Sequence, residues 1–486
     1  MQEENEDYRP RFFKLKYIII IILICTIVPF AAVGLSGLYR NILEHNAPVI
    51  ELIDVPRGIG LSPVSVKFTV TDNDAGIDEI VVRLRQKGPA KELKRLDLGG
   101  KKSEEIVLDF SADDKFLVEG TAVIDVRAFD RSFWNNSADI SLPLRVDFRK
   151  PKIEVISPQN NARLGGSQMV FYKAIDEDLA ISGVRVGGKI FLGSPATSVD
   201  KDLSDKNLHV ALYAASLDLG KDAISEIRLF AEDKVGNAVS APFYNKVVDR
   251  DFRTATVKLE EDFMRSKIVE LASKARSKKR GDDQESTSPE DRLKNDFKMV
   301  NENLRSYNET EISSLTSKSP RLESFWDGQF VRQASTIQQA FGDKITYTYE
   351  GTPLGNSRSL GEEWLLPRGS SEVLAVNAGI VVFVQDIGIY GWAVGIDHGL
   401  GLISVYSRLS KASVSNGVTV AKAQSIGLAG KSGFARNDQV YFEMRLQGLP
   451  VEPREWLDSA WFYTQIVGKT NEAKKVLGIP VYVPLQ

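Results

Sequence analysis

The chain is poor in the side chains that hold transition metals and form disulfides. Its 486 residues include three histidines, His45, His209 and His398, and one cysteine, Cys25. A single cysteine excludes an internal disulfide. A catalytic zinc needs three protein ligands, usually imidazole or carboxylate, so three scattered histidines leave few ways to build such a site.

A strong charge of one sign is missing as well. The chain has 62 Lys and Arg against 65 Asp and Glu, a net charge of −3, so the basic footprint of a nucleic-acid-binding protein is absent. Hydrophobic residues make up 43% of the sequence, which is typical of a globular protein. The length is sufficient for about three domains.

One long stretch without charge lies near the N-terminus. Residues 17–39 are 23 uncharged residues, and as a helix they would rise about 34 Å, enough to cross a bilayer. Residues 1–16 carry four basic side chains, so the positive-inside rule places them in the cytoplasm and the rest of the chain outside. We expect a single-pass, uncleaved transmembrane helix; a cleaved signal peptide is the alternative.

An internal repeat follows. Residues 48–51 (PVIE) match residues 151–154 (PKIE), and a second match occurs at nearly the same offset further along. Apolar and polar residues alternate over short runs such as residues 64–70, which is the period of a strand with one buried face. Turn-forming residues break these runs at regular intervals. We therefore expect two tandem immunoglobulin-like β-sandwiches, at residues 46–149 and 150–250.

Both repeats carry an acidic turn. It reads Asp72-Asn73-Asp74 in the first repeat, and residues 176–178 (DED) occupy the matching place in the second. Calcium prefers oxygen ligands of this kind. Asp and Asn also end strands and form turns without any ion. The turn is the simpler interpretation, and calcium binding by these domains stays open.

Residues 251–320 change to helical spacing. Two apolar stripes recur at helical intervals, one at Leu259, Phe263, Ile268 and Leu271, the other at Leu293, Phe297, Val300, Leu304 and Tyr307. Ser288-Pro289 predicts the start of the second helix, with Ser as N-cap. The charged, serine-rich run before it predicts a solvated loop. We expect a helical hairpin; a partner-binding coiled coil is the alternative.

The C-terminal region returns to strand-forming sequence. Within residues 340–458, β-branched runs at 380–384, 393–396 and 402–406 are separated by glycines. This pattern predicts an antiparallel β domain with a groove, followed by a tail at residues 459–486. The fold class expected for the whole chain is therefore mainly β.

Several short runs in this region match a known family in order. They are GEEWLLPRG at 361–369, GWAVGIDHG at 391–399, YSRLS at 406–410 and VYFEMRLQG at 440–448. Together they resemble the LytM/lysostaphin-type peptidoglycan endopeptidases. The resemblance implies an antiparallel β domain that, in active members, holds a catalytic zinc.

The resemblance also maps the family's zinc-binding and catalytic positions onto this chain. Ser359 and Glu363 stand at the two ends of its His-x-Gly-x-Asp. Arg408 stands at the histidine of its tyrosine-x-His-Leu, which is catalytic. Gln439 and Tyr441 stand at the two histidines of its His-x-His. Four histidine positions are therefore filled by serine, arginine, glutamine and tyrosine.

These replacements predict a domain without zinc and without catalytic residues. Only Glu363 still offers a metal ligand, and Arg408 brings a fixed positive charge beside it. We expect the five residues at these positions to line a ligand-binding groove instead. In that groove Arg408 would pair with a carboxylate of the ligand or form a surface salt bridge.

His398 lies in the run IDHG, which in the family does not bind the metal, so we expect it to be structural. A metal site rebuilt from His398, Glu362, Glu363 and Glu443 is the alternative, although nothing in their spacing demands it.

The function expected from the resemblance is that of a non-enzymatic envelope protein. It would be anchored in the bacterial cytoplasmic membrane, with its C-terminal domains in the periplasm or outside the cell. Its partner would be peptidoglycan or a cell-wall hydrolase. The alternatives are an active zinc peptidoglycan endopeptidase with an unrecognised metal site, and a structural spacer.

Overall fold

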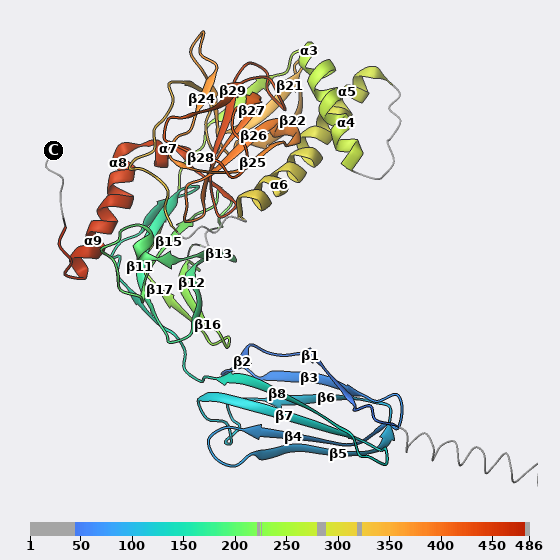
Figure 1. Cartoon of the computed structure of the whole chain (residues 1–486). Helices are drawn as coiled ribbons and strands as arrows, with labels where there is room; N and C mark the ends of the chain where they lie inside the picture. Colours follow the sequence, from blue (N-terminus) through green and yellow to red (C-terminus); the bar gives the residue numbers. More distant parts are fainter. Residues whose placement is uncertain (1–43, 221–223, 225, 279–287, 318–322, 482–486) are drawn as a thin grey trace, which may run out of the picture. The chain divides into compact units, whose positions relative to one another are not determined.

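The computed structural model describes residues 44–220, 224, 226–278, 288–317 and 323–481 (Figure 1). The protein is mainly β, as expected. It divides into two compact units, Met1–Arg149 with Lys234–Asn237, and Lys150–Asp233 with Ala238–Gln486. The expected membrane span at residues 17–39 and most of the charged loop lie outside the described residues. Within those residues, no helix is both long and apolar enough to span a membrane.

The first unit consists of two sheets around one core. The sheet orders are β1-β3-β6 and β2-β8-β7-β4-β5. The strands are β1 (Val49–Asp54), β2 (Gly58–Ile59), β3 (Val64–Thr71), β4 (Ile77–Arg85), β5 (Lys91–Lys101), β6 (Ser103–Phe110), β7 (Gly120–Asp130) and β8 (Ser137–Val146). Val66, Phe68 and Val70 are buried while the residues between them are half-buried, which confirms the predicted alternation.

The second unit begins with two four-stranded sheets, ordered β14-β15-β11-β9 and β13-β12-β16-β17, and a short parallel pair, β10-β18. The elements are β9 (Lys152–Val155), β10 (Asn161–Arg163), β11 (Ser167–Ile175), β12 (Leu179–Val186), β13 (Lys189–Leu192), β14 (Ser194–Pro195), η1 (Ala196–Ser198), β15 (Leu208–Ala214), β16 (Arg228–Asp233), β17 (Ala238–Pro242) and β18 (Lys246–Val248). The immunoglobulin-like assignment of both repeats stays a prediction.

The helical hairpin is present, with one strand that the sequence did not predict. Its elements are β19 (Thr254–Lys258), α3 (Glu261–Phe263), η2 (Met264–Ile268), α4 (Val269–Lys278), α5 (Pro289–Lys298), η3 (Met299–Leu304) and α6 (Arg305–Ser317). Ser288 caps α5, because its hydroxyl accepts a hydrogen bond from the Asp291 amide at 3.1 Å. The second stripe, Leu293 to Leu304, packs on the first helix and on strands of the C-terminal sheet.

The C-terminal region forms the expected antiparallel sheet. Its main path runs β20-β23-β30-β27-β26-β25-β28, and β19-β21-β22 form a smaller sheet. The elements are β20 (Thr336–Gln339), β21 (Lys344–Tyr349), β22 (Thr352–Arg358), β23 (Glu362–Leu365), β24 (Glu372–Leu374), β25 (Gly379–Asp386), η4 (Gly388–Tyr390), β26 (Trp392–Asp397), β27 (Leu402–Ala412), β28 (Thr419–Val420), β29 (Ser425–Ala429), β30 (Val440–Leu446) and β31 (Leu449–Val451).

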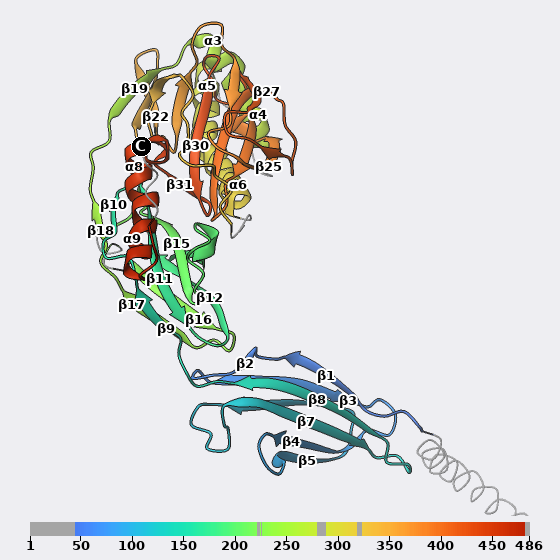
Figure 2. The same cartoon turned by 60° about the vertical axis from the view of Figure 1, so that its left-hand side comes forward.

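The end of the chain folds into helices where we expected only a tail. They are α7 (Pro453–Leu457), α8 (Ser459–Phe462), η5 (Tyr463–Val467) and α9 (Gly468–Val476), and α9 lies along β11 of the preceding sandwich (Figure 2). The buried Lys469 ammonium donates to Asn160 Oδ1 at 2.9 Å, Gln168 Oε1 at 2.6 Å and the Met169 carbonyl at 2.8 Å. Burial lowers the pKa of Lys469 to about 7, and these three acceptors offset part of the cost of burying the protonated amine.

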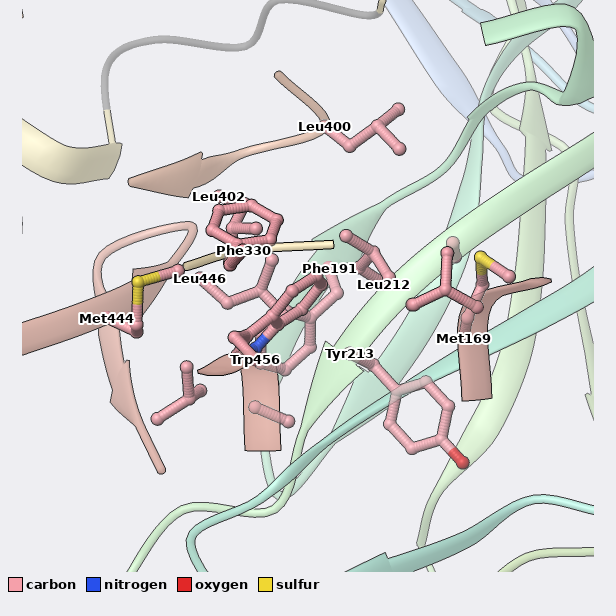
Figure 3. Packing of buried hydrophobic residues seen from close by; sticks show 14 of the residues in the cluster. Met169, Phe191, Leu212, Tyr213, Phe330, Leu400, Leu402, Met444, Leu446 and Trp456 are labelled. Atoms are coloured by element: carbon pink, nitrogen blue, oxygen red, sulfur yellow. The ribbon is translucent and has the colours of Figure 1, made fainter. Parts of the chain in front are cut away.

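The second unit shares one hydrophobic core across its two β regions (Figure 3). Met169, Leu212 and Tyr213 from the sandwich belong to the same cluster as Leu402 and Trp456 from the C-terminal region. The two β regions and the final helices are therefore packed into one body. The candidate site lies on the C-terminal sheet of this body.

Candidate functional site

The five predicted site residues meet where β23, β30 and β27 lie side by side. β30 is paired with β23 on one side and β27 on the other, with Glu363 and Ser407 both opposite Tyr441. Arg408 follows Ser407 in β27, and Ser359 precedes β23. Antiparallel pairing thus gathers side chains that are far apart in sequence.

An ion pair occupies the centre of the site. The Arg408 guanidinium contacts Glu363 Oε1 through Nη1. Gln439 Nε2 donates to the same oxygen at 3.1 Å, and Arg436 Nη2 lies 3.5 Å from Glu363 Oε2. Glu363 is 2% exposed and Arg408 is 7% exposed. Two donors therefore bind Oε1 of the retained carboxylate, whereas Oε2 accepts no hydrogen bond from the described residues and has only the Arg436 charge nearby.

Arg408 is held firmly in this place. The guanidinium carbon lies 4.7 Å from the centroid of the Tyr441 ring, a cation–π contact. Its backbone adopts φ of 65°, a left-handed conformation that is costly for a residue with a Cβ. The surface salt bridge that we considered is instead a buried one. Pairing with a carboxylate of a ligand would require Arg408 to leave Glu363.

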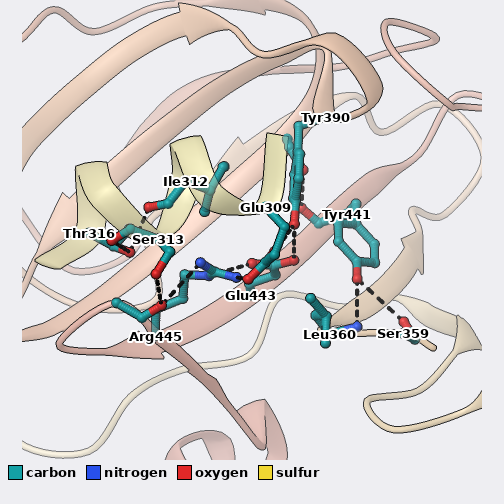
Figure 4. A network of polar contacts seen from close by, with 12 residues as sticks. Glu309, Ile312, Ser313, Thr316, Ser359, Leu360, Tyr390, Tyr441, Glu443 and Arg445 are labelled. Carbon is teal, nitrogen blue, oxygen red and sulfur yellow. Dashed lines mark hydrogen bonds and ion pairs between the residues drawn. The ribbon is translucent and has the colours of Figure 1, made fainter. Parts of the chain in front are cut away.

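The other two predicted residues are joined by hydrogen bonds (Figure 4). The Tyr441 hydroxyl accepts from the Leu360 amide at 2.9 Å and lies 3.4 Å from Ser359 Oγ. Ser359 Oγ donates to the Gly361 carbonyl at 3.0 Å. The hydroxyls at two former histidine positions are thus used to fix the loop before β23.

The charge state of Glu363 follows from its neighbours. Burial opposes ionisation of this carboxyl group. The Arg408 guanidinium outweighs it, with help from Arg436 and Gln439, and holds the pKa of Glu363 below its usual value. Glu363 is therefore an anion whose charge is neutralised within the protein.

A second buried network beside the site joins β30 to helix α6 (Figure 4). Arg445 Nε donates to Glu443 Oε2 at 2.8 Å, and its Nη2 donates to Glu309 Oε1. The Tyr390 hydroxyl lies 2.9 Å from Glu309 Oε2 and 3.0 Å from Glu443 Oε1. Burial raises the pKa of Glu443 to about 7, against the opposing effect of Arg445. The sequence offered no signal for this network, because Glu309 comes from a different element.

Helix α6 also limits the space at the site. A cavity of about 40 Å³ is lined by Ser359, Arg408 and Tyr441 together with Arg305 and Glu309 of α6. Roughly 10–15 Å³ of such space suffices for one water, so this cavity holds on the order of three waters and no peptide. Side chains of α6 thus narrow the space where the sequence predicts a groove, and ligand binding by these residues stays a prediction.

The alternative metal site is not assembled. His398 is fully buried; its Nδ1 lies 2.7 Å from the Ala378 carbonyl, and Ser404 Oγ lies 2.8 Å from its Nε2. Glu362 accepts from Trp364 Nε1 at 2.7 Å and pairs with Arg454 at 3.1 Å. Among the described residues, the one group of acidic or imidazole side chains close enough to share a metal lies elsewhere, at Glu44, Asp72 and Asp130.

The donor set at the former zinc position does not fit zinc. Zinc sites use neutral imidazole, thiolate or carboxylate ligands around an open position. Here the other four positions offer a hydroxyl, an amide, a phenol and a guanidinium, and the amide and the guanidinium already contact the one carboxylate. The Arg408 guanidinium stays protonated and has no lone pair to offer, so it repels a metal cation and cannot serve as its ligand.

The fold and these positions are those of a zinc-peptidase-type domain in which arginine contacts the retained carboxylate. Residues 358–453 match peptidase family M23, so the second unit contains an M23 (LytM-type) domain. The expected family resemblance is confirmed for this part of the chain.

The relatives include a named hydrolase activator, a sporulation protein and a named endopeptidase. The murein hydrolase activator EnvC of Escherichia coli is 27% identical over 205 residues, which cover 41% of this chain and 45% of EnvC. Stage II sporulation protein Q of Bacillus subtilis is 34% identical over 89 residues, 18% of this chain and 31% of that protein. The peptidoglycan DD-endopeptidase ShyA of Vibrio cholerae is 32% identical over 91 residues, 19% of this chain and 21% of ShyA.

Each of these matches spans less than half of the relative. Among solved structures, an M23 peptidase from Pseudomonas aeruginosa is 16% identical, covers 62% of this chain and 96% of that chain, and has a TM-score of 0.32.

Proposed function

We propose that this chain is a non-catalytic envelope protein whose M23 domain regulates a cell-wall hydrolase. The observation that carries the proposal is the buried Arg408–Glu363 pair, which places a fixed cation where a metal would be needed for peptide cleavage. A peptidase of this class needs a metal-activated water, and this donor set has no place for one.

The relatives support a regulatory role over a catalytic one. EnvC is named as an activator of murein hydrolases, and its match extends over more of this chain than that of any other relative described above. Partner binding by this chain is therefore the proposal, rather than substrate cleavage.

The small cavity favours a protein partner over a peptide in the groove. About 40 Å³ beside Arg408 and Tyr441 cannot admit a stem peptide unless α6 moves. A partner hydrolase could bind the outer surface of the domain without entering this space. Peptidoglycan itself is the second candidate ligand.

The remaining parts of the chain would place the M23 domain in the envelope. We propose that residues 17–39 anchor the chain in the cytoplasmic membrane, with the N-terminus in the cytoplasm. Two immunoglobulin-like sandwiches would then hold the M23 domain on the other side of the membrane. A reporter fused after Gln486 that works only outside the cytoplasm tests this topology.

The test of function uses the purified full chain in detergent and dye-labelled peptidoglycan. The chain alone is expected to release no dye, and to raise the rate of dye release by a cell-wall hydrolase from the same organism. An active M23 peptidase serves as the positive control. Zinc-dependent dye release by the chain alone would establish the enzymatic alternative. Absence of any effect on hydrolases, together with absence of peptidoglycan binding, would leave only the spacer.

A further inference from the structure

Three buried carboxylates meet at one end of the first unit, far in sequence from the M23 domain. Glu44 precedes β1, Asp72 follows β3, and Asp130 ends β7. One oxygen of each lies within 4.8 Å of the others. The residues are 8%, 6% and 1% exposed. Two strand ends, one from each sheet of the unit, and the segment before β1 therefore bring three negative charges into one enclosed place.

Two of these carboxylates have an oxygen without a partner. Glu44 Oε1 and Asp72 Oδ2 are buried and accept no hydrogen bond from the residues described. None of the ion pairs found among the described residues joins Glu44, Asp72 or Asp130 to a Lys or Arg. The nearby Lys102 ammonium contacts the Asp74 carbonyl oxygen instead. Buried carboxylates are normally paired or bound to a metal, because burial of an unpaired charge is costly.

The other oxygen of Asp72 and both oxygens of Asp130 accept hydrogen bonds. Asp72 Oδ1 accepts from the amides of Asp74 at 2.8 Å and Gly76 at 3.1 Å. Asp130 Oδ1 accepts from Ser132 Oγ at 2.8 Å, and Asp130 Oδ2 accepts from Asn136 Nδ2 at 2.8 Å. The side chains of Asp72 and Asp130 are thus held in place before any ion binds, which lowers the entropic cost of binding.

The electrostatics of the group agree with its geometry. Burial, together with the charges of Asp72, Asp130 and Asp74, raises the pKa of Glu44, although a backbone hydrogen bond at Ala75 opposes this. A cation placed among the three oxygens would offset the repulsion between the carboxylates. It would also give the buried oxygens of Glu44 and Asp72 the partner that they lack among the described residues.

We infer that Glu44, Asp72 and Asp130 form a calcium-binding site. The group offers only oxygen ligands, which are those preferred by hard cations, and no imidazole or thiolate that would favour zinc. Calcium accepts six to eight oxygens in irregular geometry, so backbone carbonyls and waters complete its shell. The smaller Mg²⁺ requires a regular octahedron, which is disfavoured by two carboxylates, Asp72 and Asp130, held in place by hydrogen bonds.

The bound ion would tie the start of the described chain to the sandwich. Glu44 belongs to the segment that leads into β1, whereas Asp72 and Asp130 belong to the two sheets. Asn136 Nδ2 already lies 3.4 Å from the carbonyl of Glu44. Calcium would therefore stiffen residues 44–48, which lead into β1.

The second repeat provides a matched control. Asp176 occupies the position equivalent to Asp72, but no group of three carboxylates forms around it among the described residues. Asp72→Asn keeps an oxygen that can accept from Asp74 and Gly76 while it removes the charge. Asp130→Asn tests a second ligand, and Asp176→Asn makes the same chemical change where no site is expected.

The experiment is calorimetric titration of the full chain in detergent with calcium chloride, after treatment with EGTA. We expect one calcium per chain, binding weakened at least tenfold in Asp72→Asn and Asp130→Asn, and unchanged binding in Asp176→Asn. Thermal unfolding should shift upward with calcium in the wild type and in Asp176→Asn only. With EGTA present, the two site variants should melt no lower than the wild type, because they remove repulsion.

Three results would overturn the inference. They are no calcium binding at millimolar calcium, equal binding by the wild type and both site variants, and equal affinity for magnesium. Terbium provides an independent readout, because a tryptophan near the site can transfer excitation energy to the bound ion. Trp134 lies in the loop that follows Asp130. The centroid of its ring is 5.5 Å from that of His45, the neighbour of Glu44. Sensitised terbium emission should be displaced by calcium, and Asp72→Asn should abolish it.

Discussion

Replacing Arg408 by alanine tests whether the ion pair at the former metal position stabilises the domain. The change removes the guanidinium and leaves the Glu363 carboxylate 2% exposed without its main partner. Breaking a buried ion pair by removing one partner costs about 3–5 kcal/mol. Gln439 at 3.1 Å and Arg436 at 3.5 Å remain near Glu363 and offset part of this cost. We therefore expect a loss of about 3 kcal/mol in the free energy of unfolding of the second unit.

The measurement is urea denaturation followed by tryptophan fluorescence. Trp364 reports on the site directly, because it follows Glu363, is fully buried and stacks on Phe442 at 4.2 Å between ring centroids. Arg265→Ala is the control, since its pair with Glu261 is exposed and should contribute about 0.5 kcal/mol or less.

A double mutant separates the ion pair from general damage to packing. Adding Glu363→Gln to Arg408→Ala removes the charge that the first change left unpaired. The double mutant should therefore recover about 2 kcal/mol relative to Arg408→Ala alone. A loss below about 1 kcal/mol in Arg408→Ala, or a double mutant less stable than the single one, would contradict the reasoning.

Three further predictions concern stability elsewhere in the second unit. Burial lowers the pKa of His398 from 6.5 to about 4. As the pH falls, the unfolded chain therefore binds a proton at a higher pH than the folded chain does. The stability that this residue contributes above pH 6.5 is lost as the pH falls toward 4. The contribution of His398 is the difference in unfolding free energy between the wild type and His398→Gln, measured by urea denaturation, and it should fall by about 2 kcal/mol between about pH 7 and pH 5. Lys469→Met leaves three buried acceptors unpaired and should cost about 3 kcal/mol in urea denaturation, whereas the exposed Lys475→Met should cost little. Ser288→Ala should lower the unfolding free energy by about 1 kcal/mol, through loss of the α5 cap.

Local patterns predicted the elements well. Alternation at residues 64–70 lies in β3, the β-branched runs lie in β25, β26 and β27, and Ser288-Pro289 starts α5. Each of these signals acts over a few residues, so the sequence alone is sufficient to read it. The family resemblance supplied the positions of the M23 site, because its short runs match in order.

Contacts between distant segments were beyond such reasoning. The Arg408–Glu363 pair joins residues 45 apart and depends on the order β23-β30-β27. Lys469 reaches Asn160 across 309 residues, so the final helix could not be told from a tail. The acidic turn at Asp72 was visible in sequence, but its partners Glu44 and Asp130 come from other elements. The register of paired strands, rather than local propensity, decides these contacts.

Zinc content measured together with peptidoglycan cleavage tests the central claim most directly. The full chain, purified with zinc present and then dialysed, should contain far less than one zinc per chain at the M23 position and should cleave no peptidoglycan. Glu363→Ala should leave both results unchanged. A ratio near one zinc per chain that disappears in Glu363→Ala, accompanied by cleavage that a chelator stops, would show that the domain is an active peptidase.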